Sequence, residues 1–183
     1  MHLPENFRTP CYYYDLAFLS ETLDSIIDNS LYDDFYVHYA LKANCNDMVL
    51  QRIIDRGLGA DCVSGNEVKK AIESGFPTSK ITFAGVGKSD EEIRYALVNN
   101  IFAFNVESLE ELIVIDALAG ELNTIAQVAI RINPNIDAKT HHYITTGLDE
   151  NKFGISSYDM PEVLAVLKQA NHLRFIGIHF HIG

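Results

Sequence analysis

The sequence contains little of several features that would define a protein class. Its 183 residues include only three cysteines, too few and too scattered for a disulfide framework or a zinc knuckle. Lys and Arg number 14 against 25 Asp and Glu, and the resulting net charge of -11 argues against nucleic-acid binding. No apolar run reaches the roughly 18 residues needed to span a membrane. The first residues also lack a signal-peptide pattern. These absences favour an acidic, soluble protein of the cytoplasm.

The sequence does contain a regular alternation of two segment types. Apolar runs rich in β-branched and aromatic residues predict strands at 35–41, 60–63, 81–84, 101–106, 126–132 and 175–182. Between them lie segments with helical periodicity. Four helix starts carry a capping-box spacing, in which a Ser or Asp precedes a Glu by three residues: Ser64, Ser89, Ser108 and Asp159. Three glycines are expected to end helices in a left-handed conformation: Gly57, Gly75 and Gly120.

This alternation predicts an α/β fold with a parallel sheet covered by helices. Two architectures fit the pattern, an open doubly wound sheet and a closed (β/α)8 barrel. No Gly-rich dinucleotide fingerprint follows any strand, since Gly85 and Gly87 make only a short GxG. A barrel needs about 250 residues. We therefore interpret the chain as the N-terminal portion of a longer protein.

Polar residues follow almost every predicted strand. They are Lys42 and Asn44, Asp61 and Ser64, Lys88, Asn105 and Glu107, Arg131 and Asn133, and finally His179 and His181. In parallel α/β folds the carboxyl ends of the strands meet at one rim, where active sites form. The concentration of ionisable groups there favours an active site over a purely structural domain.

Lys42 is the most informative of these residues. It lies within residues 39–44, on what reads as an otherwise apolar strand, where a charged amine is costly to bury. A desolvated amine loses its proton more readily, and the neutral amine attacks aldehydes to form a Schiff base. The alternative is a lysine whose stem packs at the strand end while its ammonium reaches water.

The histidines leave more than one interpretation open. His179 and His181 are two residues apart on a strand, so their side chains face the same way. They could form a metal-binding pair with Asp61 or Glu107, a ring-stacking histidine with its neighbour, or hydrogen-bonded core histidines. The adjacent His141 and His142 fall in a polar loop and are expected to be solvated.

Three further residues are weighed at the same rim. Arg131 closes an apolar strand, and its guanidinium suits either a bound carboxylate, phosphate or phenolate, or an ion pair with Asp61 or Glu107. Glu67 is sufficiently explained by its capping position. Cys62 is expected to be packed and unreactive, because the neighbouring carboxylate disfavours its thiolate.

Six ordered motifs resemble the fold-type III pyridoxal-phosphate decarboxylases. They are residues 39–44 (YALKAN), 57–67 (GLGADCVSGNE), 105–108 (NVES), 131–134 (RINP), 140–155 (from THHYITTG to KFGI) and 177–183 (GIHFHIG). The match extends over nearly the whole chain. Residues 140–155 are most similar to the branch of the family that acts on diaminopimelate.

The resemblance implies a role for five residues and one cofactor, pyridoxal 5'-phosphate. Lys42 is the Schiff-base lysine, and His181 stacks on the pyridine ring. Arg131 lies near the ring hydroxyl, while Asp61 and Glu67 support the lysine and the ring. No metal site is expected.

The resemblance also implies a fold, a reaction and partners. The fold is an alanine-racemase-like (β/α)8 barrel, with about six of its eight strands in this chain. Residues 1–30 would hold a strand (9–14) of an absent C-terminal β-domain and a lead-in helix, and residues 31–183 the partial barrel. The expected reaction is decarboxylation of meso-2,6-diaminopimelate to L-lysine and carbon dioxide by a cytoplasmic homodimer, with this chain alone inactive. The alternatives are an ornithine- or carboxynorspermidine-type decarboxylase, a non-catalytic pyridoxal-phosphate carrier and a metal-dependent hydrolase.

Overall fold

A computed structural model describes residues 8–29, 34–133 and 153–181 of the chain. Six strands form one sheet: β1 (His38–Ala40), β2 (Gly59–Cys62), β3 (Ile81–Phe83), β4 (Ala103–Val106), β5 (Ala126–Arg131) and β6 (Leu173–His179). Six α-helices and two short 3-10 helices accompany them: α1 (Leu16–Asp28), η1 (Leu41–Ala43), α2 (Asp47–Ile54), α3 (Gly65–Ser74), η2 (Thr78–Lys80), α4 (Asp90–Val98), α5 (Leu109–Glu121) and α6 (Met160–Gln169). The strands follow one another in sequence order, and each neighbouring pair is parallel. The predicted α/β class is confirmed.

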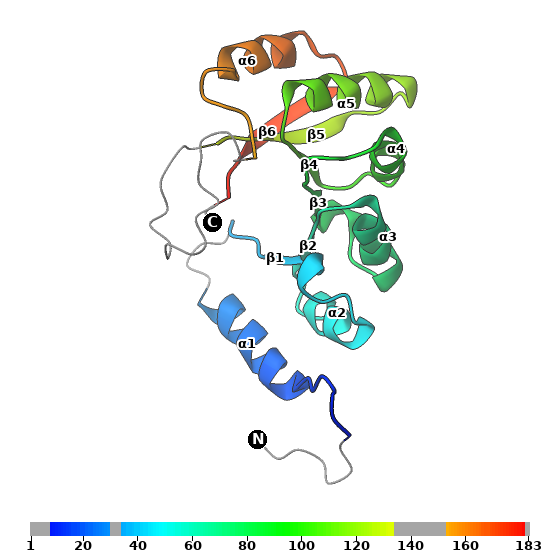
Figure 1. Cartoon of the computed structure of the whole chain (residues 1–183), viewed down its shortest axis with the longest axis vertical. Helices are drawn as coiled ribbons and strands as arrows, with labels where there is room; N and C mark the ends of the chain where they lie inside the picture. The colour runs from blue at the N-terminus through cyan, green and yellow to red at the C-terminus, as the bar shows by residue number, and fades with distance from the viewer. Residues whose placement is uncertain (1–7, 30–33, 134–152, 182–183) are drawn as a thin grey trace.

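The sheet curves, and its helices lie on the outer side. Figure 1 shows the strands along an arc from β1 to β6, with α2 to α5 outside it and α6 beyond β6. The core lies between sheet and helices, where Leu50, Ile53, Ile81, Leu112 and Ile130 are fully buried. In β4 all four residues are buried, on both faces of the sheet, which explains why such a strand reads as a nearly continuous apolar run. Within the described residues β1 and β6 pair with each other nowhere, so the arc is open.

The last strand is the least buried. β6 pairs with β5 through a register shift opposite Val128 and Ala129. Its Phe175, Ile176 and Ile178 remain 45%, 38% and 59% exposed. An apolar strand with one unpaired edge is a surface that proteins ordinarily cover.

Three of the four predicted helix starts carry a serine cap, but the complete capping box forms at only one of them. Ser64, Ser89 and Ser108 each accept the backbone N–H three residues on. Only Ser89 forms the reciprocal box, because the Glu92 carboxylate accepts the Ser89 N–H. After the other two serines the corresponding glutamate instead accepts the N–H one residue before the serine. Asp159 makes no side-chain cap, so the capping prediction is wrong there.

The predicted helix ends are correct at two glycines and wrong at the third. Gly75 caps α3 in the left-handed conformation with φ +100, and Gly57 has φ +72 beyond the end of α2. Gly120 lies inside α5 instead. A Cβ at Gly120 would lie 2.9 Å from the His172 ring, so close packing explains this glycine. The left-handed position after α5 is occupied by Asn123, with φ +51.

Residues 9–14 belong to no strand of the described structure. A strand is defined by backbone hydrogen bonds to a neighbour, and the predicted neighbour belongs to a second domain. The proposed division into residues 1–30 and 31–183 therefore stays a prediction. No helix in the described ranges has the length and apolar character to cross a membrane.

Candidate active site

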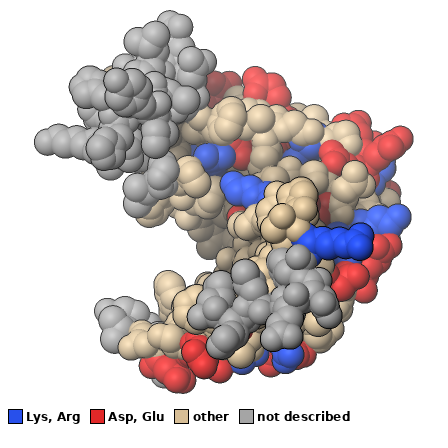
Figure 2. All heavy atoms as spheres, turned by 60° about the horizontal axis from the view of Figure 1, so that its bottom comes forward, with Lys and Arg blue, Asp and Glu red and all other residues tan. Residues whose placement is uncertain are grey.

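A cavity of about 540 Å³ lies at the carboxyl ends of the strands. Four of the five predicted site residues line it: Lys42, Asp61, Arg131 and His181. These residues come from four different strand ends, between 42 and 181 in the chain, and the fold brings them together. Figure 2 shows the molecule hollowed on one side, with Lys and Arg atoms along the inner wall. Acidic side chains gather mainly on the outer surface in that view.

Lys42 lies just beyond β1, in the 3-10 turn η1, rather than on a strand as predicted. Two hydrogen bonds shape the residues around it. Tyr39 Oη donates to the Asn44 carbonyl at 3.2 Å, and Cys45 Sγ donates to the Leu41 carbonyl at 3.0 Å. The Lys42 side chain is exposed. The prediction of a buried amine is therefore wrong for this chain, because a turn replaces the last part of the expected strand and points the lysine into the open hollow.

Lys88 is the buried lysine of the site. Its side chain is only 1% exposed and its ammonium makes three contacts. Nζ donates to the carbonyls of Gly85 at 2.8 Å and Asn105 at 3.0 Å, and to Glu111 Oε1 at 2.6 Å. Nζ also lies 5.3 Å from the centre of the Phe83 ring. All three ammonium protons are thus used, which compensates the cost of burying the charge.

Arg131 forms the ion pair that the sequence left open. Its Nη1 donates to Glu107 Oε2 at 2.6 Å, and the Glu107 side chain is 2% exposed. Glu107 Oε1 accepts the Gly85 N–H at 2.8 Å. The guanidinium carbon also lies 5.5 Å from the Phe153 ring centre. Glu107 rather than Asp61 is therefore the partner, and it fixes Arg131 at the cavity wall.

Carboxylates link neighbouring strand ends around the rim. Glu92 Oε1 accepts the Gly65 N–H at 2.6 Å, which joins the start of α4 to the start of α3. Glu111 Oε2 accepts the Glu107 N–H at 3.0 Å. Backbone N–H groups lower the pKa of Glu92, first that of Ser89 and then that of Gly65. Burial raises the pKa of Glu111, against the influence of Lys88.

The two histidines of the last strand end both reach the cavity. His179 pairs with Arg131 across β5 and β6, and its Nδ1 is buried without a hydrogen-bond partner among the described residues. Burial is the main cause that lowers the pKa of His179, and the charge of Arg131 adds to it. His181 follows the strand and is exposed. Their predicted placement on one face is consistent with their sharing this cavity.

The remaining predicted residues lie along β2 and α3. Asp61 Oδ1 accepts a hydrogen bond from Thr82 Oγ1 at 3.3 Å. Glu67 is absent from the cavity wall, and its Oε2 accepts the Val63 N–H at 2.8 Å. The fold therefore does not bring Glu67 into the group, and its support of the lysine stays a prediction. Cys62 is fully buried, and burial, more than Glu67 or Asp61, raises its pKa.

Within the described ranges, no three His, Cys, Asp or Glu side chains come close enough to bind a metal ion. His141 and His142 lie outside those ranges, as does Lys152, the first residue of the KFGI motif.

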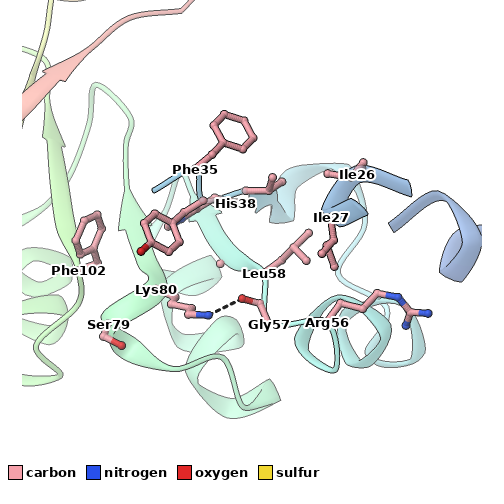
Figure 3. A pocket seen from close by; sticks show the side chains of 13 residues that line it. Ile26, Ile27, Phe35, His38, Arg56, Gly57, Leu58, Ser79, Lys80 and Phe102 are labelled. Carbon is pink, nitrogen blue, oxygen red and sulfur yellow. Dashed lines mark hydrogen bonds between the residues drawn. The ribbon is translucent and has the colours of Figure 1, made fainter. Parts of the chain in front are cut away.

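A second cavity, of about 440 Å³, lies at the opposite end of the strands. Figure 3 shows Ile26 and Ile27 of α1 on one side of it and Phe102 on the other. Its two cationic side chains are already engaged: Lys80 Nζ donates to the Gly57 carbonyl at 2.6 Å, and Arg56 pairs with an aspartate of α1. With a largely apolar wall and both cationic side chains already hydrogen-bonded, this cavity is the weaker candidate for catalysis.

Sequence reasoning did not identify Glu92 and Glu111 as rim residues. Both occupy the third position of a helix, and the capping pattern explained them fully. Their long-range contacts, to Gly65 and to Lys88, depend on how neighbouring strand ends align. The one signal in the sequence that could have identified them is the carboxylate in the first turn of the helices that follow strands.

Comparisons with known proteins point to one family of enzymes. Residues 25–183 match the family model described as "Pyridoxal-dependent decarboxylase, pyridoxal binding domain". The chain is similar to the diaminopimelate decarboxylase of Bacteroides thetaiotaomicron, with 54% identity over 177 residues, or 96% of this chain and 46% of that protein. It is 42% identical over 181 residues to the Campylobacter jejuni protein of that name, 99% of this chain and 45% of the relative.

Solved structures give the same result in three dimensions. Diaminopimelate decarboxylase from Helicobacter pylori, complexed with L-lysine, superposes with a TM-score of 0.90 at 42% identity, covering 98% of this chain and 45% of that one. The arginine decarboxylase of Paramecium bursaria Chlorella virus superposes with a TM-score of 0.71 at 27% identity, covering 90% and 43%. The chain thus spans about half the length of the relatives that it matches.

Proposed function

The chain belongs to the family of pyridoxal-dependent decarboxylases, and from that premise we propose that it forms part of an enzyme converting meso-2,6-diaminopimelate to L-lysine and carbon dioxide. The observation that carries the proposal is the meeting of Lys42, Asp61, Arg131 and His181 in one cavity at the carboxyl ends of the strands. Relatives at 54% and 42% identity named diaminopimelate decarboxylase support the choice of substrate. So does the lysine-complexed structure from Helicobacter pylori.

The residues of the cavity fit pyridoxal 5'-phosphate, the cofactor of the family. Among the described residues the Lys42 ammonium has no hydrogen bond or ion pair, so it is available to a ligand. The buried Nδ1 of His179 is an unsatisfied polar atom at the same wall. Cationic Arg131 and Lys42 suit a ligand that carries anionic oxygens. A cavity of about 540 Å³ accommodates a molecule of this size.

Pyridoxal phosphate, when bound, supplies an aldehyde that captures amines and a conjugated ring that takes up the electrons of a broken carbon–carboxylate bond. The chain supplies the groups that hold it. We assign Lys42 as the residue whose amine holds the cofactor and is exchanged for the substrate amine. The turn η1 presents that amine to the cavity, with Leu41 buried behind it as an anchor.

Three of the other four predicted residues would orient the cofactor directly. Arg131, fixed by Glu107, would present its guanidinium to an anionic ring oxygen. His181 would pack against the ring, and Asp61 would support the lysine from the adjacent strand. Glu67 would act indirectly, since its carboxylate holds the Val63 backbone two residues after Asp61.

We propose that the complete enzyme closes the arc into an alanine-racemase-like barrel and carries a β-domain that receives residues 9–14. Chains of that kind would act in the cytoplasm as homodimers. The length of the relatives, about twice that of this chain, supports a larger whole. Sedimentation of the complete enzyme at twice its chain mass would agree with the dimer.

An arginine decarboxylase at 27% identity shares this fold, so the fold alone does not choose the substrate. The test is to measure carbon dioxide release by the complete polypeptide from meso-diaminopimelate, L-ornithine and L-arginine. We expect turnover of the first, its loss in Lys42→Ala, and full activity in Lys69→Ala, whose side chain is exposed on α3. Preference for ornithine or arginine, or activity without Lys42, would overturn the proposal. The 183-residue chain alone is expected to be inactive.

A further inference from the structure

Lys88 is a charged residue buried at the rim that the proposed reaction does not use. Its ammonium spends one proton on the Glu111 carboxylate and two on backbone carbonyls, those of Gly85 and Asn105. The contacts belong to the loop after β3, to β4 and to α5. A single buried ammonium therefore connects three segments of the chain.

The loop after β3 is held at both backbone groups of one residue, Gly85. The Gly85 carbonyl accepts from Lys88, while the Gly85 N–H donates to Glu107 Oε1 at 2.8 Å. Gly85 has φ +110, and a Cβ there would lie 2.9 Å from the Val63 carbonyl oxygen. The loop is thus confined between Val63, Lys88 and Glu107. It forms part of the wall of the candidate site.

Glu111 completes a path from Lys88 to Arg131. Its Oε1 accepts from Lys88, and its Oε2 accepts the Glu107 backbone N–H at 3.0 Å. Glu107 in turn accepts Arg131 Nη1 through Oε2. None of the three hydrogen bonds that Lys88 donates goes to Arg131 or to the Glu107 side chain. Its influence must pass through Glu111 and through the Gly85 peptide.

We propose that Lys88 is a positioning residue: with Glu111 it fixes the Gly85 peptide and the Glu107 backbone, and so holds the Arg131 guanidinium at the cavity wall. The two cations at the rim therefore have different roles. Lys88 donates all three of its protons within the chain and has none left for a ligand. Arg131 faces the cavity, and what it binds there rests on the proposed function.

The experiment uses amide hydrogen exchange, measured by NMR on the complete polypeptide without added cofactor. The test variant is Lys88→Met, and the matched control is Lys80→Met, whose ammonium contacts the Gly57 carbonyl at the far end of the sheet. We expect the Gly85 and Glu107 amides to exchange about tenfold faster in Lys88→Met, because each would lose protection equivalent to about one hydrogen bond. The Arg131 side-chain N–H signals should shift with them. Lys80→Met should leave all of these signals unchanged.

A second variant separates positioning from simple charge compensation. Lys88→Met with Glu111→Leu removes both members of the buried pair, which often restores stability because no unpaired charge remains. We expect global protection to recover while the Gly85 amide, whose own acceptor Glu107 is retained, stays fast. Should Lys88→Met alone prove unfolded, this double variant and Glu111→Gln carry the same test.

The proposal is overturned if the Gly85 and Glu107 amides keep their protection, or if they change only in step with core amides such as that of Val128. Failure of the proposed function is visible separately, as a wild-type chain that shows the expected exchange pattern yet does not bind pyridoxal phosphate.

Discussion

Lys42 and Lys88 follow the first and third strands of one sheet and line one cavity, yet their surroundings are opposite. The ammonium of Lys88 is buried and fully paired, whereas that of Lys42 is exposed and, among described residues, has no partner. The same contrast separates the sectors in which they lie. From β3 to β5 the rim is tied by buried ion pairs, while β1 and β6 are the open ends of the arc.

The contrast indicates how an active site and a stable rim can share one surface. A lysine that must exchange partners needs an amine that the folded chain does not engage. A lysine that fixes geometry needs the reverse, with every proton donated and water excluded. Burial of a charged group is thus no sign of catalysis here, because the buried lysine is the structural one.

The largest expected effect sets the two lysines directly against each other. Lys88→Met removes one member of a buried ion pair and should lower the free energy of unfolding by about 3–5 kcal/mol. Lys42→Met, at an exposed position, should change it by no more than about 0.5 kcal/mol. Urea unfolding of both variants gives the comparison. Equal losses would show that the two sectors do not differ as described.

An intermediate effect is expected within one loop of the tied sector. Gly85→Ala places a Cβ 2.9 Å from the Val63 carbonyl at a φ of +110, which should cost about 2 kcal/mol. Gly87→Ala has open space around it and should change stability by less than about 0.5 kcal/mol. Thermal unfolding of the pair measures the difference. A tolerated Gly85→Ala would mean that the loop is not held where we describe it.

The smallest effect concerns Glu92, which joins α4 to α3. Glu92→Gln should cost about 1 kcal/mol at pH 7, because charged acceptors of helix N–H groups contribute this much. Its folded pKa lies below the ordinary 4.5, so its stabilisation is present above that value and is lost as pH falls through the folded pKa.

The difference in unfolding free energy between wild type and Glu92→Gln, measured by urea unfolding, should therefore shrink as the pH falls below 4.5. Glu91→Gln, on the exposed side of the same helical turn, is the control for removing a carboxylate from this turn. A difference in unfolding free energy that stays constant down to acid pH would show that the Glu92 carboxylate does not provide this stabilisation.

Much of the fold could be predicted because its determinants are local. The serines before α3, α4 and α5 and the apolar runs of the strands act over a few residues. The site was harder, since Glu92 and Lys88 find partners 27 and 23 residues away. Those contacts depend on the alignment of neighbouring strand ends, which no local pattern contains.

Lys42 shows the same limit from the other side. The apolar run at 35–41 predicted a long strand, but β1 spans only His38–Ala40 and the chain turns before the lysine. The position of Lys42 in the cavity followed from the order of the strands. The exposure of Lys42 did not follow from that order, because exposure depends on which residues lie on the other side of the cavity.

The assignment of Lys42 is tested most directly by chemical trapping. The chain is mixed with pyridoxal 5'-phosphate, reduced with borohydride to make the bond between amine and aldehyde permanent, digested and analysed by mass spectrometry. The account predicts that the label concentrates on the peptide that contains Lys42 and is absent from Lys88. Label on Lys88, or spread evenly over exposed lysines such as Lys69, would contradict it.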